Sequence, residues 1–218
     1  MKKLLCSVLC LSFVLFCFAA CSDNNNTPTD NNTSSPEAGT TLVAEPHSAA
    51  DETIRKNNVC HVEMTIRDYG TIKIELYPDE APESVQNFIE LAKSGFYNGV
   101  GFHRLDKDFF LQGGDPDGDG RGGSEKTIKG EFANNGVQNT ISHKRGVISM
   151  ARTNDPDSAS SQFFICLEDS TFLDGNYAAF GYVTDGMNII DRIRDTTPES
   201  GSIPKNQQPV IESIKVID

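Results

Sequence analysis

The sequence lacks the short motifs on which several classes of enzyme depend. It contains no HExxH zinc motif, no GxSxG nucleophile motif and no GxxxxGK[ST] phosphate-binding loop. Zinc-protease, α/β-hydrolase and P-loop nucleotide chemistry therefore have no candidate residues. Positive charge is also scarce, since 19 Lys and Arg stand against 31 Asp and Glu, a net charge of −12. Such an acidic balance argues against a nucleic-acid partner and against electrostatic binding to anionic lipid.

Cysteine is scarce in the part of the chain that we expect to fold. Cys6, Cys10 and Cys17 lie in an N-terminal apolar run, which leaves only Cys60 and Cys166 in the candidate domain. Two cysteines exclude a disulfide framework. They leave two interpretations open, a single bridge formed in an oxidising compartment or two buried thiols.

The N-terminus has the pattern of a secretory signal. Lys2 and Lys3 precede a run without charge from Leu4 to Ala20. The run ends in FAAC, which resembles the bacterial lipoprotein signal, so we predict a signal peptide at residues 1–20. Cys21 would then be the lipidated, for example palmitoylated, N-terminus of a mature chain with 17 basic and 31 acidic residues and a net charge of −14.

An uncleaved transmembrane anchor is the alternative for this segment, although its length is at the short end of a membrane span. Either interpretation places the domain outside the cytoplasm. It would be tied to a bacterial membrane, on the periplasmic side or at the cell surface.

Residues 21–58 are predicted to form the lipidated cysteine and a flexible linker. The stretch SDNNNTPTDNNTSSPEAGTT is rich in Asn, Thr, Ser and Pro and has too few apolar residues to bury a core. We therefore expect one folded domain, at residues 59–218.

The pattern of this domain is mainly β. Alternating apolar residues predict a hairpin over 59–77, and apolar spacing at i, i+3, i+4 and i+7 predicts a helix over 82–95. We predict a second helix at about 186–194. Further strands are expected at 100–105, 108–113, 146–151, 162–167, 177–183 and about 209–217. Many short strands with two helices favour a closed antiparallel sheet whose ends the helices cover.

One glycine-rich loop, GGDPDGDGRGG, carries two motifs that we interpret as chance matches. Asp115, Asp117 and Asp119 match the first ligands of an EF-hand, but Lys126 stands where the bidentate Glu belongs and no helices flank the loop. The same loop has GxGxxG spacing without a following helix. We predict no metal site, although a calcium-dependent adhesion lipoprotein stays open as a rival function. His143, in the loop SHKRG, is interpreted as structural.

Three separated stretches resemble one family. They are FHRLDKDFFLQGGD at 102–115, ISMAR with SSQFFI at 148–152 and 160–165, and FLDGNYAAFG at 172–181. Together they are similar to the cyclophilins, which are peptidyl-prolyl cis/trans isomerases, and the resemblance runs from about Val59 to Asp218. It implies an eight-stranded antiparallel barrel with two capping helices, and a reaction that needs no nucleophile, metal or cofactor.

The resemblance also implies the site residues. Arg104 would stabilise the twisted peptide bond, with Phe109 in the wall of the proline pocket and Gln112 bonded to the substrate backbone. The remaining substrate-binding positions would be Phe102, His103, Met150, Ala151, Arg152, Gln162, Phe163, Phe172, Leu173 and Tyr177.

Three of these positions depart from the pattern of many eukaryotic cyclophilins. Phe172 stands in place of Trp, Tyr177 in place of His and Arg152 in place of Asn. These departures leave substrate preference and cyclosporin sensitivity open.

The partners expected from this resemblance are proline-containing polypeptides, bound by a monomer that the lipid holds at the membrane. The predicted function is acceleration of X-Pro rotation, which assists the folding of extracytoplasmic proteins. The alternative is a proline-peptide binding module or holdase chaperone that uses the same groove.

Overall fold

The computed structural model describes residues 58–218. The predicted signal peptide, Cys21 and almost all of the predicted linker lie outside these described residues. Within the described part, no helix is both long enough and apolar enough to cross a membrane.

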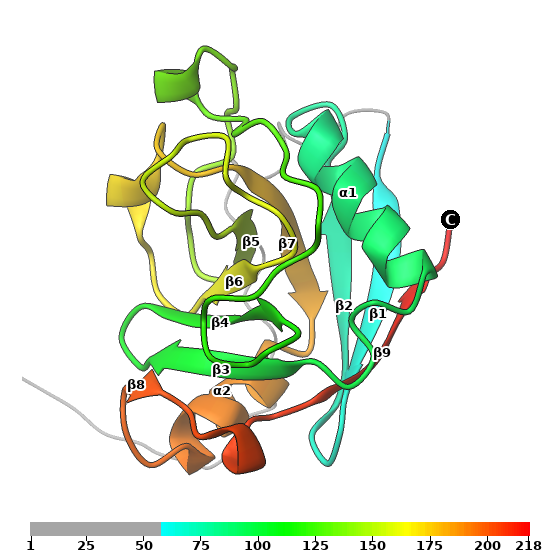
Figure 1. The fold of residues 1–218 in the computed structure, drawn as a ribbon, viewed down its shortest axis with the longest axis vertical. Coiled ribbons are helices and arrows are strands. Elements are labelled where there is room, and N and C mark those ends of the chain that lie inside the picture. Colours follow the sequence, from blue (N-terminus) through cyan, green and yellow to red (C-terminus); the bar gives the residue numbers. More distant parts are fainter. Residues whose placement is uncertain (1–57) are drawn as a thin grey trace, which may run out of the picture. The chain divides into compact units, whose positions relative to one another are not determined.

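The described domain contains nine strands and two α-helices. Figure 1 shows how they are arranged. The first helix, α1, spans Pro82–Lys93 and the second, α2, spans Met187–Thr196. Three short 3-10 helices lie at Ala133–Asn135, Thr171–Leu173 and Lys205–Gln207. The strands are β1 Cys60–Ile66, β2 Gly70–Leu76, β3 Gly101–Asp106, β4 Phe110–Asp115, β5 Val147–Met150, β6 Phe163–Cys166, β7 Ala179–Asp185, β8 Gly201–Ser202 and β9 Ile211–Val216.

All eight expected strands and both expected helices are present within about two residues of their predicted bounds. The prediction of a closed eight-stranded barrel is wrong. The strands form one curled nine-stranded sheet in the order β8-β3-β4-β6-β5-β7-β2-β1-β9. The additional strand, β8, has two residues, too few to leave an alternating pattern.

The two ends of this sheet come together without forming a ladder. Gly101 of β3 and Val210, just before β9, form an isolated bridge. Beside it, Phe102 donates its N–H to the carbonyl of Pro209, and Ile211 donates to the carbonyl of Val100. The sheet is therefore a curled, open half-barrel rather than a closed barrel.

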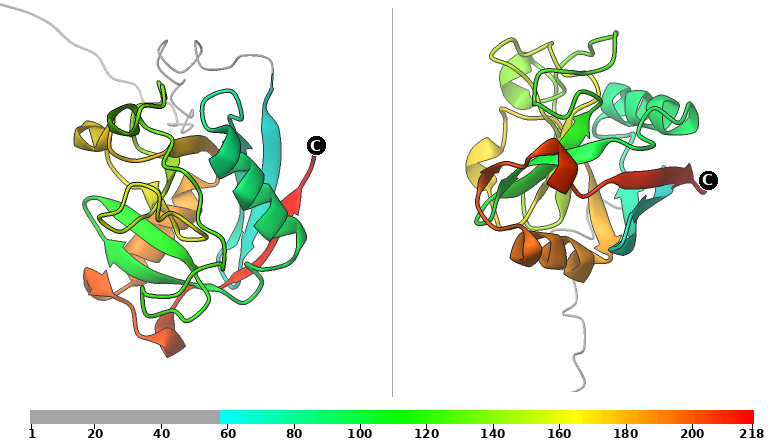
Figure 2. Two further views of the ribbon diagram at one scale, coloured as in Figure 1. Left: turned by 45° about the horizontal axis from the view of Figure 1, so that its top comes forward. Right: turned by 60° about the horizontal axis from the view of Figure 1, so that its bottom comes forward.

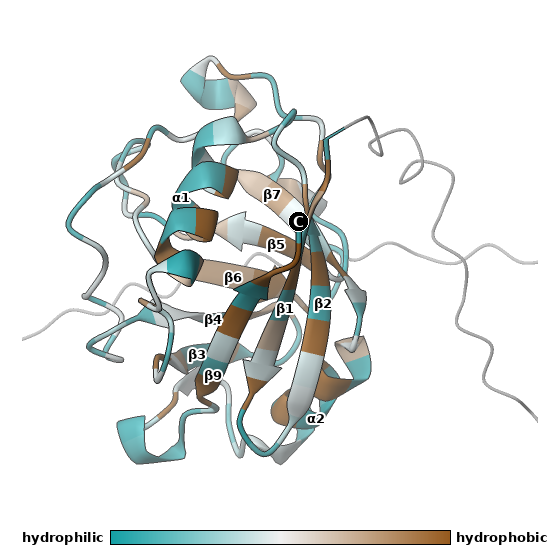
Figure 3. Ribbon diagram, turned by 90° about the vertical axis from the view of Figure 1, so that its right-hand side faces the viewer, coloured by the Kyte–Doolittle hydropathy of each residue, from teal (hydrophilic) through white to brown (hydrophobic). Residues whose placement is uncertain are grey.

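Alternating burial explains why the sheet curls around one core. Val62, Met64 and Ile66 of β1 are buried while the residues between them are more exposed, and β2 repeats the pattern. The helices α1 and α2 lie at opposite ends of the curled sheet (Figure 2). In Figure 3 the apolar side of α1 faces the sheet and its polar side faces away.

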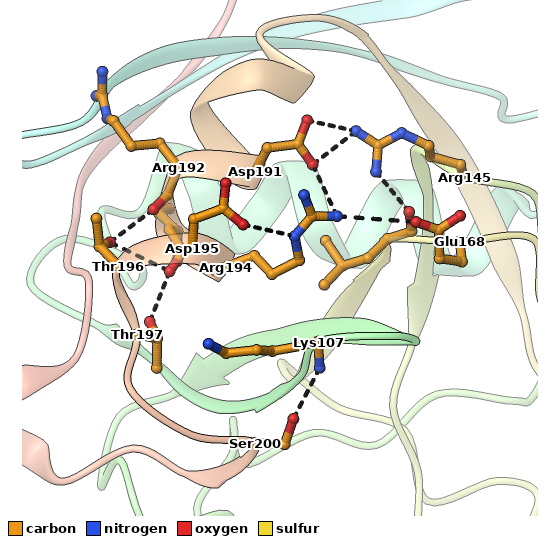
Figure 4. A network of polar contacts seen from close by, with 12 residues as sticks. Lys107, Arg145, Glu168, Asp191, Arg192, Arg194, Asp195, Thr196, Thr197 and Ser200 are labelled. Carbon is orange, nitrogen blue, oxygen red and sulfur yellow. Dashed lines mark hydrogen bonds and ion pairs between the residues drawn. The ribbon is translucent and has the colours of Figure 1, made fainter.

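A network of ion pairs fastens α2 to the loop after β6 (Figure 4). Arg145 donates to both carboxylate oxygens of Asp191, at 2.8 and 2.7 Å, and to the carbonyl of Leu167 at 2.6 Å. Arg194 of α2 pairs with Asp191 at 3.4 Å and with Glu168 at 3.9 Å. These contacts hold α2 against the segments that precede β5 and follow β6.

Candidate active site

A β-bulge in β3 determines where Arg104 points. Phe102 lies opposite Gly113 and Arg104 lies opposite Gln112, so His103 is an extra residue in β3. A bulge of this kind changes the face on which the following residue lies. As a result Phe102 is buried in the core, whereas Arg104 is exposed on the outer face.

The strand register places the predicted site residues on two different faces. Arg104 pairs with Gln112, and Gln112 pairs with Phe164, so these three side chains form a row on the outer face. On the next row, Phe102, Gly113, Phe163 and Met150 are neighbours across four strands. Successive residues of a strand point to opposite faces, so this second row faces the core.

Three residues that were predicted to bind substrate therefore lie in the core instead. Phe102, Met150 and Phe163 are at most 1% exposed and belong to the main core. They pack inside the sheet instead of lining a groove. Gly113 lies in the same row, and its lack of a side chain makes room for Phe102, because a Cβ there would lie 2.8 Å from the Phe102 ring.

The outer row forms one side of an apolar groove of about 360 Å³. Most of the predicted residues line it, and two residues that the sequence interpretation missed, Phe110 and Phe164, line it as well. Strand alternation could have found both, because Phe110 lies two residues before Gln112 and Phe164 lies two residues after Gln162. The lining is Arg104, Phe109, Phe110, Gln112, Ala151, Arg152, Phe164, Phe172, Leu173 and Tyr177.

Aromatic rings follow one another along this groove. The ring centroids of Phe172 and Phe109 lie 5.2 Å apart, and those of Phe109 and Phe110 lie 4.6 Å apart. Phe110 and Phe164 follow at 5.8 Å, then Phe164 and Tyr177 at 5.9 Å. These spacings are typical of favourable aromatic pairs. The groove thus offers a pre-formed apolar surface, with Phe172 69% exposed at its rim.

The guanidinium of Arg104 lies over one of these rings. Its central carbon is 4.8 Å from the centroid of Phe110, a cation–π distance. Within the described part of the chain, the guanidinium of Arg104 makes no hydrogen bond and no ion pair. Its N–H donors therefore remain available to a ligand in the groove.

Gln112 is oriented by a second glutamine. Gln112 Nε2 donates to Gln162 Oε1 at 2.8 Å, and Gln162 Nε2 donates to the carbonyls of Gly122 at 2.7 Å and Gly120 at 3.2 Å. Gln162 therefore connects the amide of Gln112 to the glycine-rich loop.

Arg152 connects the edge of the groove to its far wall. Its Nε and one terminal nitrogen donate to the carbonyl of Asn176, at 3.0 and 2.9 Å, and the other donates to the carbonyl of Thr153 at 2.8 Å. The guanidinium also lies 4.7 Å from the ring centroid of Tyr177. Arg152 and Tyr177, two of the departures from the eukaryotic pattern, are therefore in contact with each other.

Behind the groove, a buried histidine supports the wall that carries Leu173. His143 Nδ1 is 2.8 Å from Asp174 Oδ1, and Nε2 is 3.0 Å from Ser149 Oγ. The ring of His143 stacks on Phe164, with centroids 6.1 Å apart. Burial lowers the pKa of His143 despite the opposing effect of Asp174. The Ser149–His143–Asp174 order resembles a hydrolase triad, but Ser149 is fully buried and no substrate reaches it.

His103 does not lie in the groove, which corrects another predicted substrate contact. It is 4% exposed, and neither ring nitrogen has a hydrogen-bond partner among the described residues. Burial lowers its pKa, with Asp115 acting in the opposite direction. As the bulged residue, His103 sits behind Arg104 instead of beside a ligand.

A second, polar section of about 550 Å³ adjoins the apolar one. The two sections share Arg104, Gln112, Ala151 and Arg152 at their border. The polar section is also lined by Gly120, Arg121, Gly122, Gly123, Ser124, Thr153, Ser158, Ser160 and Gln162. Gln162 belongs to this section and not to the apolar one.

The aspartate-rich loop beside the polar section is held by its own backbone. Asp115 Oδ1 accepts the N–H of Asp117, and Oδ2 accepts those of Asp119 and Gly120. These bonds lower the pKa of Asp115 although burial acts to raise it. In residues 58–218 no three His, Cys, Asp or Glu side chains gather in an arrangement that would hold a metal ion.

Both cysteines of the domain are free thiols in the structure. Cys166 is buried in β6, and burial raises the pKa of its thiol to about 12. Cys60 is partly buried at the start of β1.

Comparison with known proteins agrees with this geometry. Residues 61–216 match the model of the cyclophilin-type peptidyl-prolyl cis-trans isomerase family. A peptidyl-prolyl cis-trans isomerase-like 1 protein of Rhizopus delemar is 51% identical over 128 residues, which are 57% of this chain and 74% of that protein. A peptidyl-prolyl cis-trans isomerase of Helicobacter pylori is 46% identical over 127 residues, or 57% of this chain and 75% of the relative.

Solved structures of cyclophilin-type isomerases are also similar to this chain. A cyclophilin-type isomerase of Cryptosporidium parvum, 29% identical, aligns with a TM-score of 0.66 over 74% of this chain and 99% of its own. The structure of that protein in the presence of the dipeptide Ala-Pro aligns with a TM-score of 0.62, at 30% identity over 72% of this chain and 99% of its own. The chain described here belongs to the cyclophilin-type peptidyl-prolyl cis-trans isomerase family.

Proposed function

We propose that the protein catalyses X-Pro rotation in extracytoplasmic polypeptides at the groove, as a monomer, with Arg104 as the decisive hydrogen-bond donor. Its isomerase activity follows from the family.

The chemistry explains why an arginine is suited to this reaction. The peptide C–N bond resists rotation by about 18–20 kcal/mol because nitrogen shares its lone pair with the carbonyl. As the bond twists, the lone pair returns to nitrogen, which becomes a hydrogen-bond acceptor near the transition state. A donor aimed at that nitrogen stabilises the transition state more than the substrate. Arginine stays charged and carries several donors on one planar group.

The observation that carries the proposal is the position of the Arg104 guanidinium. It lies over Phe110 in the apolar groove without a hydrogen bond or ion pair among the described residues. An exposed arginine of structural importance would ordinarily donate to a carboxylate or a carbonyl, as Arg145 does here. Arg104 instead lines the groove with its donors free, so they would be within reach of a bound substrate.

The apolar section would hold the proline ring while the preceding residue rotates. Its rings are already packed against each other, so little order has to be gained on binding. Gln112, fixed by Gln162, would bond the substrate backbone. A five-decade acceleration requires about 7 kcal/mol, and one charged hydrogen bond contributes about 1.5–3 kcal/mol. Holding the ring in place would therefore have to contribute the remainder.

Binding of a minimal substrate tests the placement of the ring. The solved relative was studied with Ala-Pro, and we expect the same dipeptide, added to the ¹⁵N-labelled protein, to shift the amide signals of Gln112 and Ala151. Phe110→Asp would place a charge in the apolar section and should abolish these shifts. Shifts confined to residues outside the groove, or unchanged binding by the variant, would contradict the proposed site.

The cellular location rests on the N-terminal sequence, which resembles a lipoprotein signal. We propose that Cys21 carries the lipid, and that the isomerase assists folding outside the cytoplasm. Cys21→Ser should then move the protein from the membrane fraction to the soluble extracytoplasmic fraction, and radiolabelled fatty acid should mark only the unaltered chain. A variant that stays in the membrane with residues 1–20 attached would support the transmembrane anchor instead.

A further inference from the structure

The polar section of the groove has a charge opposite to that of the chain as a whole. The chain has a net charge of −12. Three of the residues that line the polar section, Arg104, Arg121 and Arg152, are cationic, and no Asp or Glu lines it. A random selection of surface from so acidic a chain would be expected to include carboxylates.

The positive charges of this section are not neutralised by ion pairs. Arg121 is exposed, and its only hydrogen bond in the described part is donated by its backbone N–H to Asp119. The guanidinium of Arg104 has neither a hydrogen bond nor an ion pair there. Arg152 donates only to carbonyl groups, which leaves its full charge in place.

Four acids of the two bordering loops direct carboxylate oxygens at backbone N–H groups. Asp115 and Asp119 accept from the loop that contains them. Asp155 accepts the N–H of Asp157, and Asp157 accepts that of Gly130. None of these four acids lines the section, although the carboxylate of Asp117 lies beside Gly122 of its wall.

Backbone donors line the same wall. The N–H groups of Gly122, Gly123 and Ser124 make no hydrogen bond within residues 58–218. The wall is closely packed, because a Cβ at Gly122 would lie 2.1 Å from Asp115 Oδ1, which backbone N–H groups hold in place, and one at Gly123 would lie 2.4 Å from Ser160 Oγ. Gln162 holds this wall in place through the carbonyls of Gly120 and Gly122.

The border between the two sections determines which part of a substrate would reach the wall formed by Gly122, Gly123 and Ser124. The rotating C–N bond joins the proline ring to the residue before it. With the ring in the apolar section and Arg104 at the prolyl nitrogen, the preceding residues extend past Gln112 and Ala151 into the polar section. We propose that this section binds a carboxylate side chain N-terminal to the proline, so that the enzyme prefers acidic sequences before X-Pro. This inference rests on the proposed function of the groove.

The expected preference is modest because the section is open to water. Exposed charge pairs are weak individually, so we expect about a 1.5- to fivefold higher kcat/KM for a glutamate peptide than for its glutamine counterpart. Salt should reduce the ratio toward one, since the screening length falls from about 10 Å at 0.1 M to about 3 Å at 1 M.

The test compares peptides that differ only two or three residues before the proline, with Glu, Gln or Lys there. Turnover is measured with the full-length protein by NMR exchange spectroscopy, which needs no coupled protease. We expect the order Glu above Gln above Lys. Equal turnover of the three peptides would overturn the acidic preference while leaving the isomerase site intact, whereas absence of turnover on all of them would contradict the proposed function itself.

Two variants separate a local from a general charge effect. Arg121→Gln should lower the Glu-to-Gln ratio. Arg67→Gln changes the net charge equally, but Arg67 lies in the turn between β1 and β2 and lines neither section, so the ratio should stay at the unaltered value. An equal fall in both variants, or no fall with Arg121→Gln, would overturn the assignment of this wall.

Discussion

Phe163 and Phe164 are neighbours in the chain, but their replacement by smaller residues should have different effects. Truncation of Phe163 should mainly lower stability, and truncation of Phe164 should mainly lower catalytic activity. Phe163 is fully buried, and its ring makes edge contacts with those of Phe88, Tyr97 and Phe102. Phe164 lies on the other face of β6, in the apolar section of the groove. The pair therefore tests the strand register on which the candidate site depends.

The magnitudes follow from the surroundings of each ring. Phe163→Ala would leave a closed cavity in the core and should cost about 3–5 kcal/mol of unfolding free energy, a large part of the about 5–15 kcal/mol that a domain has. The space left by Phe164→Ala opens to the groove and fills with water. Its cost should then be nearer the transfer free energy of the side chain alone, about 1.5–3 kcal/mol.

The loss of catalytic activity should be larger for the Phe164 variant than for the Phe163 variant. A proline ring that loses one wall of its pocket loses about half the burial of its three methylenes, about 1.2 kcal/mol at 0.8 kcal/mol each. Phe164→Ala should therefore lower kcat/KM about eightfold. Phe163→Leu keeps an apolar side chain in the core and should retain most of the turnover in the folded fraction.

Urea unfolding and turnover on a short proline peptide measure the two effects. At a urea dependence of about 2 kcal/mol per M, Phe163→Ala should lower the midpoint by about 2 M. Unchanged kcat/KM in folded Phe164→Ala, together with a specific catalytic loss in stable Phe163→Leu, would show that the faces have been assigned the wrong way round.

Two further predictions concern the rim and the buried histidines. Cyclosporin should inhibit weakly, because Phe172, 69% exposed beside Phe109, has no N–H donor; Phe172→Trp should tighten inhibition about 5–150-fold, and tight inhibition of the unaltered protein would contradict this. The pKa values of His103 and His143 are lowered by burial, so the folded state binds fewer protons than the unfolded state below the ordinary value of 6.5, and stability should fall as pH drops from there. The fall should be at most about 2.7 kcal/mol per pH unit for the two groups, and urea midpoints that stay constant between pH 7 and pH 5 would refute it.

Most of the fold could be predicted because alternation and helical spacing are local properties. Each buried face of β1, β2 and α1 leaves its own period in the sequence. The open, curled sheet could not be predicted in this way. Whether its ends form a ladder depends on the pairing of Gly101 with Val210, residues that are far apart in the chain and have no pattern in common.

The site was predictable in outline but not in its inward and outward positions. The resemblance identified the stretches, and most of the named residues do line the groove. The motif SSQFFI does not show which phenylalanine faces outward, and the bulge at His103 reverses the face of Arg104 relative to simple alternation. The contacts of His143 with Asp174 and Ser149 join segments whose proximity only the folded chain reveals.

The most direct measurement of the central claim is the turnover of Arg104→Ala and Arg104→Lys, each verified as folded and able to bind Ala-Pro. If the Arg104 donor stabilises the twisted bond, the alanine variant should lose about 1.5–3 kcal/mol of transition-state stabilisation, or about 10- to 150-fold in kcat. Lysine should recover little of it, because a point charge lacks the planar fork of donors. Wild-type turnover by well-folded Arg104→Ala would contradict the mechanism.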